Sequence, residues 1–165
     1  KWTTKYRPVT QQEVEKGRIG KDCYINGASM IVHRSVIESI GKLSEATFLY
    51  FEELDFSIRL KKSPYKQEII DKVLIQHIGA GSSKGKGLSK MRMYHETWST
   101  LAFYKKHYHK FFYYIIFVRT PLRMVTLLLK RRYTELPEVI RATFDFLRGE
   151  NRYKQPVELI EKIFL

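Results

Sequence analysis

The sequence contains a single cysteine, Cys23, so it forms neither an internal disulfide nor a zinc site made of cysteine thiolates. This scarcity fits a reducing compartment. The first ten residues lack the apolar run of a signal peptide. They also lack an initiator methionine, and we therefore expect the chain to be part of a longer protein.

Acidic residues are almost absent between residues 84 and 132, a stretch that has twelve lysines or arginines and one acid, Glu96. This stretch carries most of the formal charge of +13. Such a stretch indicates a polyanionic partner, either nucleic acid or an anionic membrane surface. The composition as a whole, 44% hydrophobic and 28% charged, is typical of a globular protein.

Two short apolar segments predict β-strands: CYINGASMIVHRS, residues 23–35, and KVLIQHIG, residues 72–79. Gly27 and Ala28 in the first segment indicate a close approach of backbone or ligand. The second segment is followed by AGSSKGKGLSK, residues 80–90, which predicts a flexible basic loop.

The segment SVIESIGKL, residues 35–43, predicts a short helix from its end signals. Ser35 is the expected N-cap, and Glu38 completes a capping box three residues later. Gly41 is the expected terminator.

The segment FLYFEELDFSIRLKK, residues 48–62, places three carboxylates within four positions. On a helix that starts near Glu52 these acids lie in the first turn, where the helix dipole favours negative charge. Asp55 and Arg59 then form an i,i+4 ion pair. Apolar residues also alternate between 56 and 60, as in a strand, but the stripe of charge favours the helix.

The second half of the chain is predicted to be helical, and its residues 111–129 match a membrane span in length. Arg119 and Arg123 would each cost about 2.5–3.5 kcal/mol in the bilayer, and Pro121 breaks the middle, so we exclude a span. On a helix, the two arginines line up with Lys130 opposite an apolar side. This pattern predicts a helix in the membrane interface with its basic edge on anionic headgroups. Packing of the helix on the protein's own core is the alternative.

The segment LPEVIRATFDFLRG, residues 136–149, predicts the last helix. Pro137 lies in its first turn and Gly149 is its expected terminator. Its charged residues form one stripe on such a helix: Glu138, Arg141, Asp145 and Arg148.

These elements, in this order, resemble the second half of family 2 glycosyltransferases of GT-A fold, most of all the bacterial rhamnosyltransferase and galactofuranosyltransferase branch. YINGASMIVHRSVIESIGKL is similar to a family segment in which Gly-Ala precedes a methionine and a basic residue. FLYFEELDFSIRL resembles the acidic motif of the family, and VLIQHIGAGSS resembles its strand that ends in histidine before glycine and serine. The resemblance covers about residues 22–148.

The resemblance implies an α/β fold. Residues 1–88 would be the acceptor-side, catalytic part of a Rossmann-like GT-A domain, an α+β fragment without its nucleotide-binding half. Residues 89–165 would be a helical C-terminal region, basic and amphipathic.

The resemblance further implies an inverting glycosyltransferase with Glu53 as general base. Such a base removes the proton of the acceptor hydroxyl while the oxygen attacks the anomeric carbon of the donor sugar. Glu52 would orient the acceptor or support the pair, and Asp55 would hold Arg59 and help to fix the helix. For Glu53, a carboxylate favoured only by the helix dipole is the alternative.

A metal and several substrate contacts are implied in the same way. His77 would bind Mn²⁺ or, less often, Mg²⁺; a structural histidine at a strand end is the alternative. The loop after it would fold over a diphosphate. The candidate substrate-binding residues are Gly27, Ala28, Arg59, Ser82, Ser83 and Lys84.

The Asp-x-Asp motif with which the family completes its metal site is absent from the sequence. We therefore expect the nucleotide-binding half outside these residues, and no turnover by this chain alone. The donor would be a dTDP- or UDP-sugar, such as dTDP-rhamnose or a UDP-hexose. The acceptor would be a surface polysaccharide or a lipid-linked oligosaccharide, reached from the cytoplasm at the inner face of the cell membrane.

A nucleic-acid-binding module is the competing class, because the pI is near 9.8 and tyrosines are mixed with lysines between residues 94 and 114. The basic helices are too apolar for this class, and no RRM, KH or helix-turn-helix signature is present. A membrane-bound scaffold without catalysis is a third class. It would keep the basic helices but would not need the acidic doublet.

Overall fold

The computed structural model describes residues 29–47, 49–68 and 86–150, together with Gln12, Lys16, Tyr24 and Gly27. Of these described residues 68% are helical and none belongs to a strand. The predicted α/β fold, an α+β fragment of a Rossmann-like GT-A domain, is therefore wrong.

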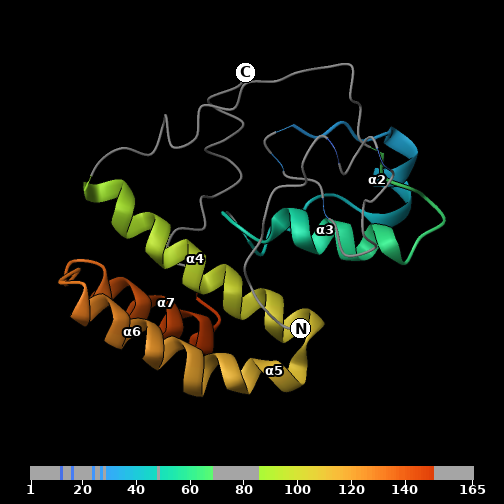
Figure 1. The fold of residues 1–165 in the computed structure, drawn as a ribbon. Helices are drawn as coiled ribbons and strands as arrows, with labels where there is room; N and C mark the ends of the chain where they lie inside the picture. Colours follow the sequence, from blue (N-terminus) through green and yellow to red (C-terminus); the bar gives the residue numbers. More distant parts are fainter. Residues whose placement is uncertain are drawn as a thin grey trace.

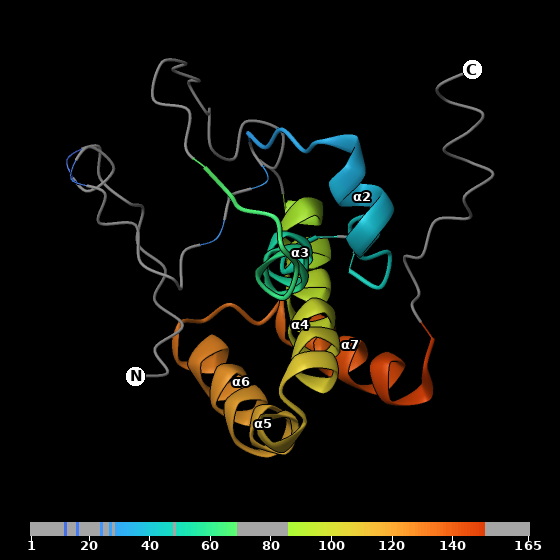
Figure 2. The same cartoon turned by 90° about the vertical axis from the view of Figure 1, so that its right-hand side faces the viewer.

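Helices make up nearly all of the regular structure in the described part. In chain order they are α2 (Arg34–Ile40), α3 (Glu52–Lys61), α4 (Lys86–His107), α5 (His109–Tyr114), the π-helical η1 (Ile115–Arg119), α6 (Thr120–Leu129) and α7 (Leu136–Arg148). The long helix α4 lies at the centre, with α2 and α3 on one side and α5, α6 and α7 on the other (Figures 1 and 2). Residues 86–90, predicted as loop, form the first turns of α4.

Residues 29–33 show why the first predicted strand is not found. A strand needs the hydrogen-bonding groups of a neighbouring strand, and the described residues offer none beside this segment. Met30 and Val32 pack on the core between α2 and α3, whereas Ile31 between them is 87% exposed. The alternation in the sequence thus reflects packing on helices. The second predicted strand, residues 72–79, lies outside the described residues.

Helix α2 begins earlier than its expected cap. The backbone N–H of Ser35 donates to Nδ1 of His33 at 3.3 Å, so His33 is the N-cap in place of Ser35. Glu38 does not form a capping box but pairs with Arg34 at 2.7 Å. The predicted end is confirmed, because Gly41 follows the helix with a φ of 83°, which glycine adopts without strain.

Helix α3 begins at Glu52, as predicted. It buries Phe56 and Leu60 against Val36 of α2, and Tyr65 packs at the edge of this small core. The side chains of these residues exclude water from only one side of α3. The other side of the helix is free to pack against α4.

The layer of α4, α5, α6 and α7 has a larger core that is rich in aromatic side chains. Tyr94 and Trp98 of α4 stack at 6.3 Å between ring centroids and pack on Ala142 of α7. Further along α4, Leu101 packs on Phe112 of α5. Between residues 93 and 103 most side chains of α4 are buried, on several faces of the helix, as expected for a helix at the centre of the fold.

The segments α5, η1 and α6 form one continuous helix, His109–Leu129, although Pro121 was expected to break it. A π turn, Ile115–Arg119, widens the helix just before the proline, and Pro121 then lies in the first turn of α6. In this π turn the N–H of Thr120 donates to the carbonyl of Ile115, five residues back, and the shifted hydrogen-bond pattern accommodates the proline, which has no N–H. By length and composition alone, this helix is long and apolar enough to cross a membrane.

Helix α7 ends as predicted, at Gly149 with a φ of 77°. Its charged stripe lies partly inside the protein, because Glu138 and Asp145 are both buried. The Tyr94 hydroxyl donates to Oδ2 of Asp145 at 3.0 Å, and Arg141 pairs with Glu138 at 2.9 Å. The acids are tolerated inside because each has a donor.

His95 of α4 gives the fold a measurable pH dependence. Its side chain is fully buried, and this burial lowers the pKa of His95. The native state therefore stays neutral while the unfolded state takes up a proton below about pH 6.5. The free energy of unfolding is therefore independent of His95 protonation above that pH. Below it, the free energy of unfolding decreases by up to about 1.4 kcal/mol per pH unit.

We expect His95→Gln to reduce this loss of stability between pH 7.5 and pH 5.5 in urea denaturation. His109→Gln, at an exposed position of α5, is the matched control and should retain the loss. Equal pH dependence in both variants would contradict a role for His95.

Candidate functional site

The first turn of α3 presents the two carboxylates of Glu52 and Glu53, which the sequence predicted as a catalytic pair. Acids are favoured at this helix end by the dipole. No side chain caps the helix, and its N-cap residue, Phe51, has a left-handed backbone with a φ of 70°. Tyr50 before it is also left-handed, with a φ of 69°. Two consecutive left-handed residues other than glycine cost about 1–2 kcal/mol each.

Hydrogen bonds to α4 hold the segment that contains this turn. The indole N–H of Trp98 donates to the carbonyl of Ala46 at 2.9 Å, and the Ser99 hydroxyl donates to the carbonyl of Leu49 at 2.7 Å. Arg92 donates to the Tyr50 hydroxyl at 2.9 Å. The strained turn is therefore fixed by contacts from a rigid helix, and these contacts set the direction of the Glu52 and Glu53 side chains.

Glu53 lies against Gly27, the glycine that the sequence predicted as a point of close approach. The backbone N–H of Gly27 donates to Oε1 of Glu53 at 3.2 Å. A Cβ at position 27 would stand 2.8 Å from that oxygen, so only glycine leaves the carboxylate in place. Burial, and then the charge of Glu53, raise the pKa of Tyr24. The phenol of Tyr24 is thus a further neighbour of this carboxylate, which the sequence did not predict.

Glu52 is in a drier environment. Its Oε2 is buried and has no hydrogen-bond partner in the described protein. Burial raises the pKa of Glu52, and the charge of Glu53 raises it further, although a backbone hydrogen bond acts in the opposite direction. The doublet therefore combines a carboxyl group that retains its proton to higher pH with a neighbour held by a backbone N–H.

Asp55 has a different role from the other two acids, as predicted. It is almost fully buried, and Arg59 donates to its Oδ2 at 2.9 Å, which confirms the i,i+4 pair. Its Oδ1 binds Lys106 at 2.5 Å and His107 at 2.7 Å, both at the end of α4. Burial alone would raise the pKa of Asp55, but the hydrogen bonds from Lys106, His107 and Arg59 outweigh it, and the pKa is lowered.

Arg59 connects Asp55 to α2. Its guanidinium donates to the carbonyls of Ile40, Gly41 and Lys42, the last at 2.7 Å. These carbonyls belong to the end of a helix, where no intrahelical donor is left for them. Arg59 was also a candidate for substrate binding, but its donors are used within the protein. Lys106 and His107 were missed by the sequence reasoning, because nothing in a basic helix end indicates a buried partner 50 residues away.

Five other candidate residues lie outside the described part of the chain: Ala28, His77, Ser82, Ser83 and Lys84. The metal implied with His77 has no counterpart among the residues that can be described. Within them, no group of three or more His, Cys, Asp or Glu side chains could hold an ion. Glu52, Glu53 and Asp55 thus do not form a metal site by themselves.

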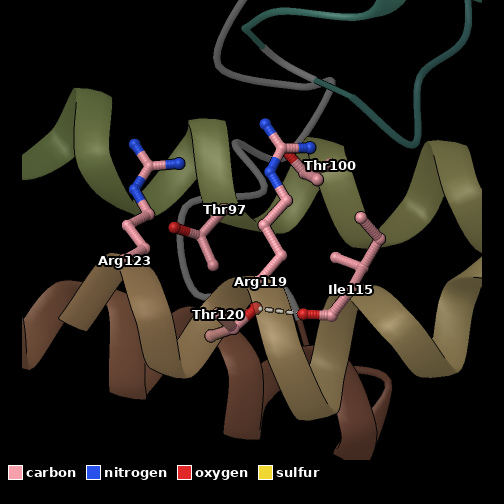
Figure 3. Close-up of a pocket in the computed structure, with 6 residues that line it drawn as sticks. All are labelled: Thr97, Thr100, Ile115, Arg119, Thr120 and Arg123. Atoms are coloured by element: carbon pink, nitrogen blue, oxygen red, sulfur yellow. Dashed lines mark hydrogen bonds between the residues drawn. The ribbon is translucent and has the colours of Figure 1, made fainter. Parts of the chain in front are cut away.

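A second polar site lies between α4 and the η1–α6 segment. Arg119 and Arg123 extend from that segment toward α4, beside Thr97 and Thr100 (Figure 3). Arg123 pairs with Glu96 of α4 at 2.7 Å. The space between these side chains is small and opens to solvent. The two arginines, which the sequence predicted on headgroups, therefore face the protein.

Comparison of the chain with protein-family models, with curated proteins and with solved structures found no match.

The buried charge network makes Asp55→Asn a severe change, although the shape of the side chain is retained. It leaves Arg59 and Lys106 without a negative partner, and we expect a loss of about 3 kcal/mol in the free energy of unfolding at pH 7. Because the native pKa is lowered, the stabilisation by Asp55 is present above about pH 3.9 and is lost as the pH falls through the native value. The free energy of unfolding of Asp55→Asn should therefore not show this decrease at acidic pH.

The control is Glu38→Gln, which removes the exposed ion pair with Arg34 on α2. It should cost less than about 1 kcal/mol. Urea denaturation at pH 7 and at pH 3 measures both variants. Similar losses for both would show that Asp55 does not stabilise the junction of α2, α3 and α4.

Proposed function

We propose that this chain is the acceptor-side part of an inverting sugar transferase, with Glu53 as the general base. The proposal has two supports, the motifs in the sequence and the separation of roles among the three acids. Asp55 is neutralised by three donors and holds the helices together, whereas Glu53 accepts one backbone N–H and carries no ion pair among the described contacts. This separation is the observation that carries the proposal.

The chemistry that we propose takes place at Glu53. A carboxylate oxygen of Glu53 takes the proton from the acceptor hydroxyl, and the hydroxyl oxygen forms a bond to the anomeric carbon of the donor sugar. The bond from that carbon to the nucleotide diphosphate breaks, and its electron pair leaves with the phosphate oxygen. The N–H of Gly27 keeps one carboxylate oxygen of Glu53 in place, so the other is free for the hydroxyl.

Glu52 and Tyr24 complete the surroundings of the base. Burial raises the pKa of Glu52, and a carboxyl group that keeps its proton to higher pH repels the charge of Glu53 less. The phenol of Tyr24 is protonated at neutral pH, as tyrosine ordinarily is, and burial raises its pKa further. A protonated phenol suits a ligand that is rich in hydroxyl groups.

The proposed donor is a dTDP- or UDP-sugar, and the proposed acceptor is a surface polysaccharide or lipid-linked oligosaccharide at the inner face of the cell membrane. The family resemblance implies that Mn²⁺ or Mg²⁺ would neutralise the charge of the leaving diphosphate. The residue implied in holding it, His77, lies outside the described residues.

Replacement of Glu53 by Gln tests the proposed base. The amide oxygen of Gln can still accept from the Gly27 N–H, so the fold should be unchanged while the proton acceptor is lost. We expect kcat for transfer from dTDP- or UDP-sugars to fall about 10²–10⁴-fold in the native gene product that contains this sequence. Thermal unfolding should shift by less than about 2 °C, because the change is partly exposed.

Glu38→Gln, the same chemical change on α2, should leave kcat unaltered. A wild-type rate in Glu53→Gln would remove Glu53 from the mechanism and favour the non-catalytic scaffold.

Gly27→Ala tests the placement of the base without changing any acid. The added Cβ would stand 2.9 Å from Cγ of Glu53, and the flexible carboxylate would move to relieve this contact. We expect kcat to fall at least about tenfold, because a displacement of about 1 Å at a reacting group costs that much or more. The unfolding temperature should remain close to that of the wild type. Loss of stability together with activity would mean that Gly27 has a structural role only.

A further inference from the structure

The helix His109–Leu129 presents its apolar side to the surroundings. The most exposed large side chains are Phe117 and Leu129, at 73% and 80%. Between them, Leu122 and Val125 are at least half exposed. Successive members of this set are three to five residues apart, which places them on one side of the helix. A large exposed apolar surface of this kind marks a contact with another apolar phase.

The polar side of the same helix faces α4. Arg119 and Arg123 extend toward that helix (Figure 3), and Arg123 is held there by Glu96 at 2.7 Å. Thr120, next to them, is buried and donates to the carbonyl of Ile115 at 2.9 Å. The helix thus buries Phe112, Ile115 and Leu127 on the side toward the protein, where its two arginines also lie, and leaves a second set of apolar residues exposed.

Charge at the two ends of the helix suits an anionic lipid surface. Between residues 109 and 133 the sequence has six lysines or arginines and no acid. Lys110 lies at one end, and Lys130 and Arg131 lie at the other, all of them exposed. Exposed tyrosines accompany both ends, Tyr113 near the first and Tyr133 beyond the second. Cations and tyrosines flanking an apolar surface are the composition of a helix at the membrane interface.

We propose that the side of this helix formed by Phe117, Leu122, Val125 and Leu129 inserts into an anionic lipid bilayer, with the helix axis parallel to the membrane plane. Arg119, Arg123 and three threonines line a solvent-open space on the opposite side, which has to remain in water. A helix with one side in lipid and the other in water lies in the interface and does not cross it. This assignment does not depend on the role of Glu53.

Two other occupants of this side are conceivable, a second copy of the chain and an acidic protein. A second copy would bring another set of lysines and arginines against the first, and no acid between residues 109 and 133 would offset this repulsion. An acidic protein would satisfy the ends of the helix, but its charged surface would leave the apolar centre in water. The bilayer offers both an apolar interior and a negative surface.

The first test is flotation of the chain with vesicles that contain phosphatidylglycerol, compared with vesicles of phosphatidylcholine alone. The test variant is the double substitution Phe117→Ser, Leu129→Ser, which changes two exposed side chains and no core contact. The matched control is Ile31→Ser, which removes an equally exposed apolar residue near α2. Circular dichroism and thermal unfolding check that all three proteins keep the same helix content.

We expect the wild type and Ile31→Ser to float with anionic vesicles, and the double variant to lose at least about tenfold in partitioning. Binding should weaken at high salt and on phosphatidylcholine. Wild-type binding by the double variant, or failure of the wild type to bind, would overturn the proposal. A concentration-dependent dimer in light scattering that the double variant abolishes would overturn it in favour of a second copy.

A second test reports depth directly. In a Cys23→Ser background, a polarity-sensitive fluorophore is attached at Leu122→Cys or, as the control, at Ile31→Cys. Brominated lipids should quench the probe at position 122, most strongly when the bromine atoms lie near the headgroup boundary. They should not quench the probe at position 31. Quenching strongest at the bilayer centre would indicate a span and overturn the interfacial orientation.

The membrane-binding tests and the Glu53→Gln activity test can fail independently of each other. A protein that binds vesicles through this side and shows no loss of activity in Glu53→Gln would retain the membrane assignment and lose the proposed base. If activity depends on Glu53 but the double variant still binds vesicles as the wild type does, the proposed base is retained and the membrane assignment is lost.

Discussion

The buried carboxylate of Asp55 is the interaction on which the described structure depends. Arg59 donates to one carboxylate oxygen of Asp55 and also to three carbonyls at the end of α2. Lys106 and His107, at the end of α4, bind the other oxygen. The small core between α2 and α3 and the larger core of α4 to α7 would otherwise be joined only by side-chain packing and a few hydrogen bonds. A charged group inside a protein is costly unless it is paired, and the pairing here gives a defined junction of three helices.

Helix ends and local ion pairs could be predicted from the sequence, because they depend on residues within one turn of each other. The start of α3 at Glu52, the Asp55–Arg59 pair and the glycine ends at Gly41 and Gly149 are of this kind. The strand predicted around Met30 was wrong because alternation of apolar residues also serves a segment that lies on helices. The partners of Asp55 on α4 could not be predicted, because a pair 50 residues apart depends on the packing of α3 and α4.

For a related reason, the sequence could not predict which side of the helix His109–Leu129 faces the protein. The period of its residues defines two sides, one basic and one apolar, but does not say which side faces the protein. The structure shows that Phe112, Ile115 and Leu127 are buried toward the protein, and that Arg123 pairs there with Glu96, the one acid within the basic stretch. The π turn before Pro121 also went unpredicted, since the proline alone indicated a break.

The strained turn at Tyr50 and Phe51 has a geometric consequence. It is bound to α4 at Arg92, Trp98 and Ser99, so the first turn of α3 moves with α4 as one body. The η1–α6 segment lies on the other side of α4 from α3 (Figure 1), and its exposed apolar residues lie opposite the arginines that face α4. The Glu52 and Glu53 carboxylates thus stand at a constant height above the proposed lipid surface, one helix layer removed from it. A saccharide hydroxyl would reach them only from a chain long enough to cover that height.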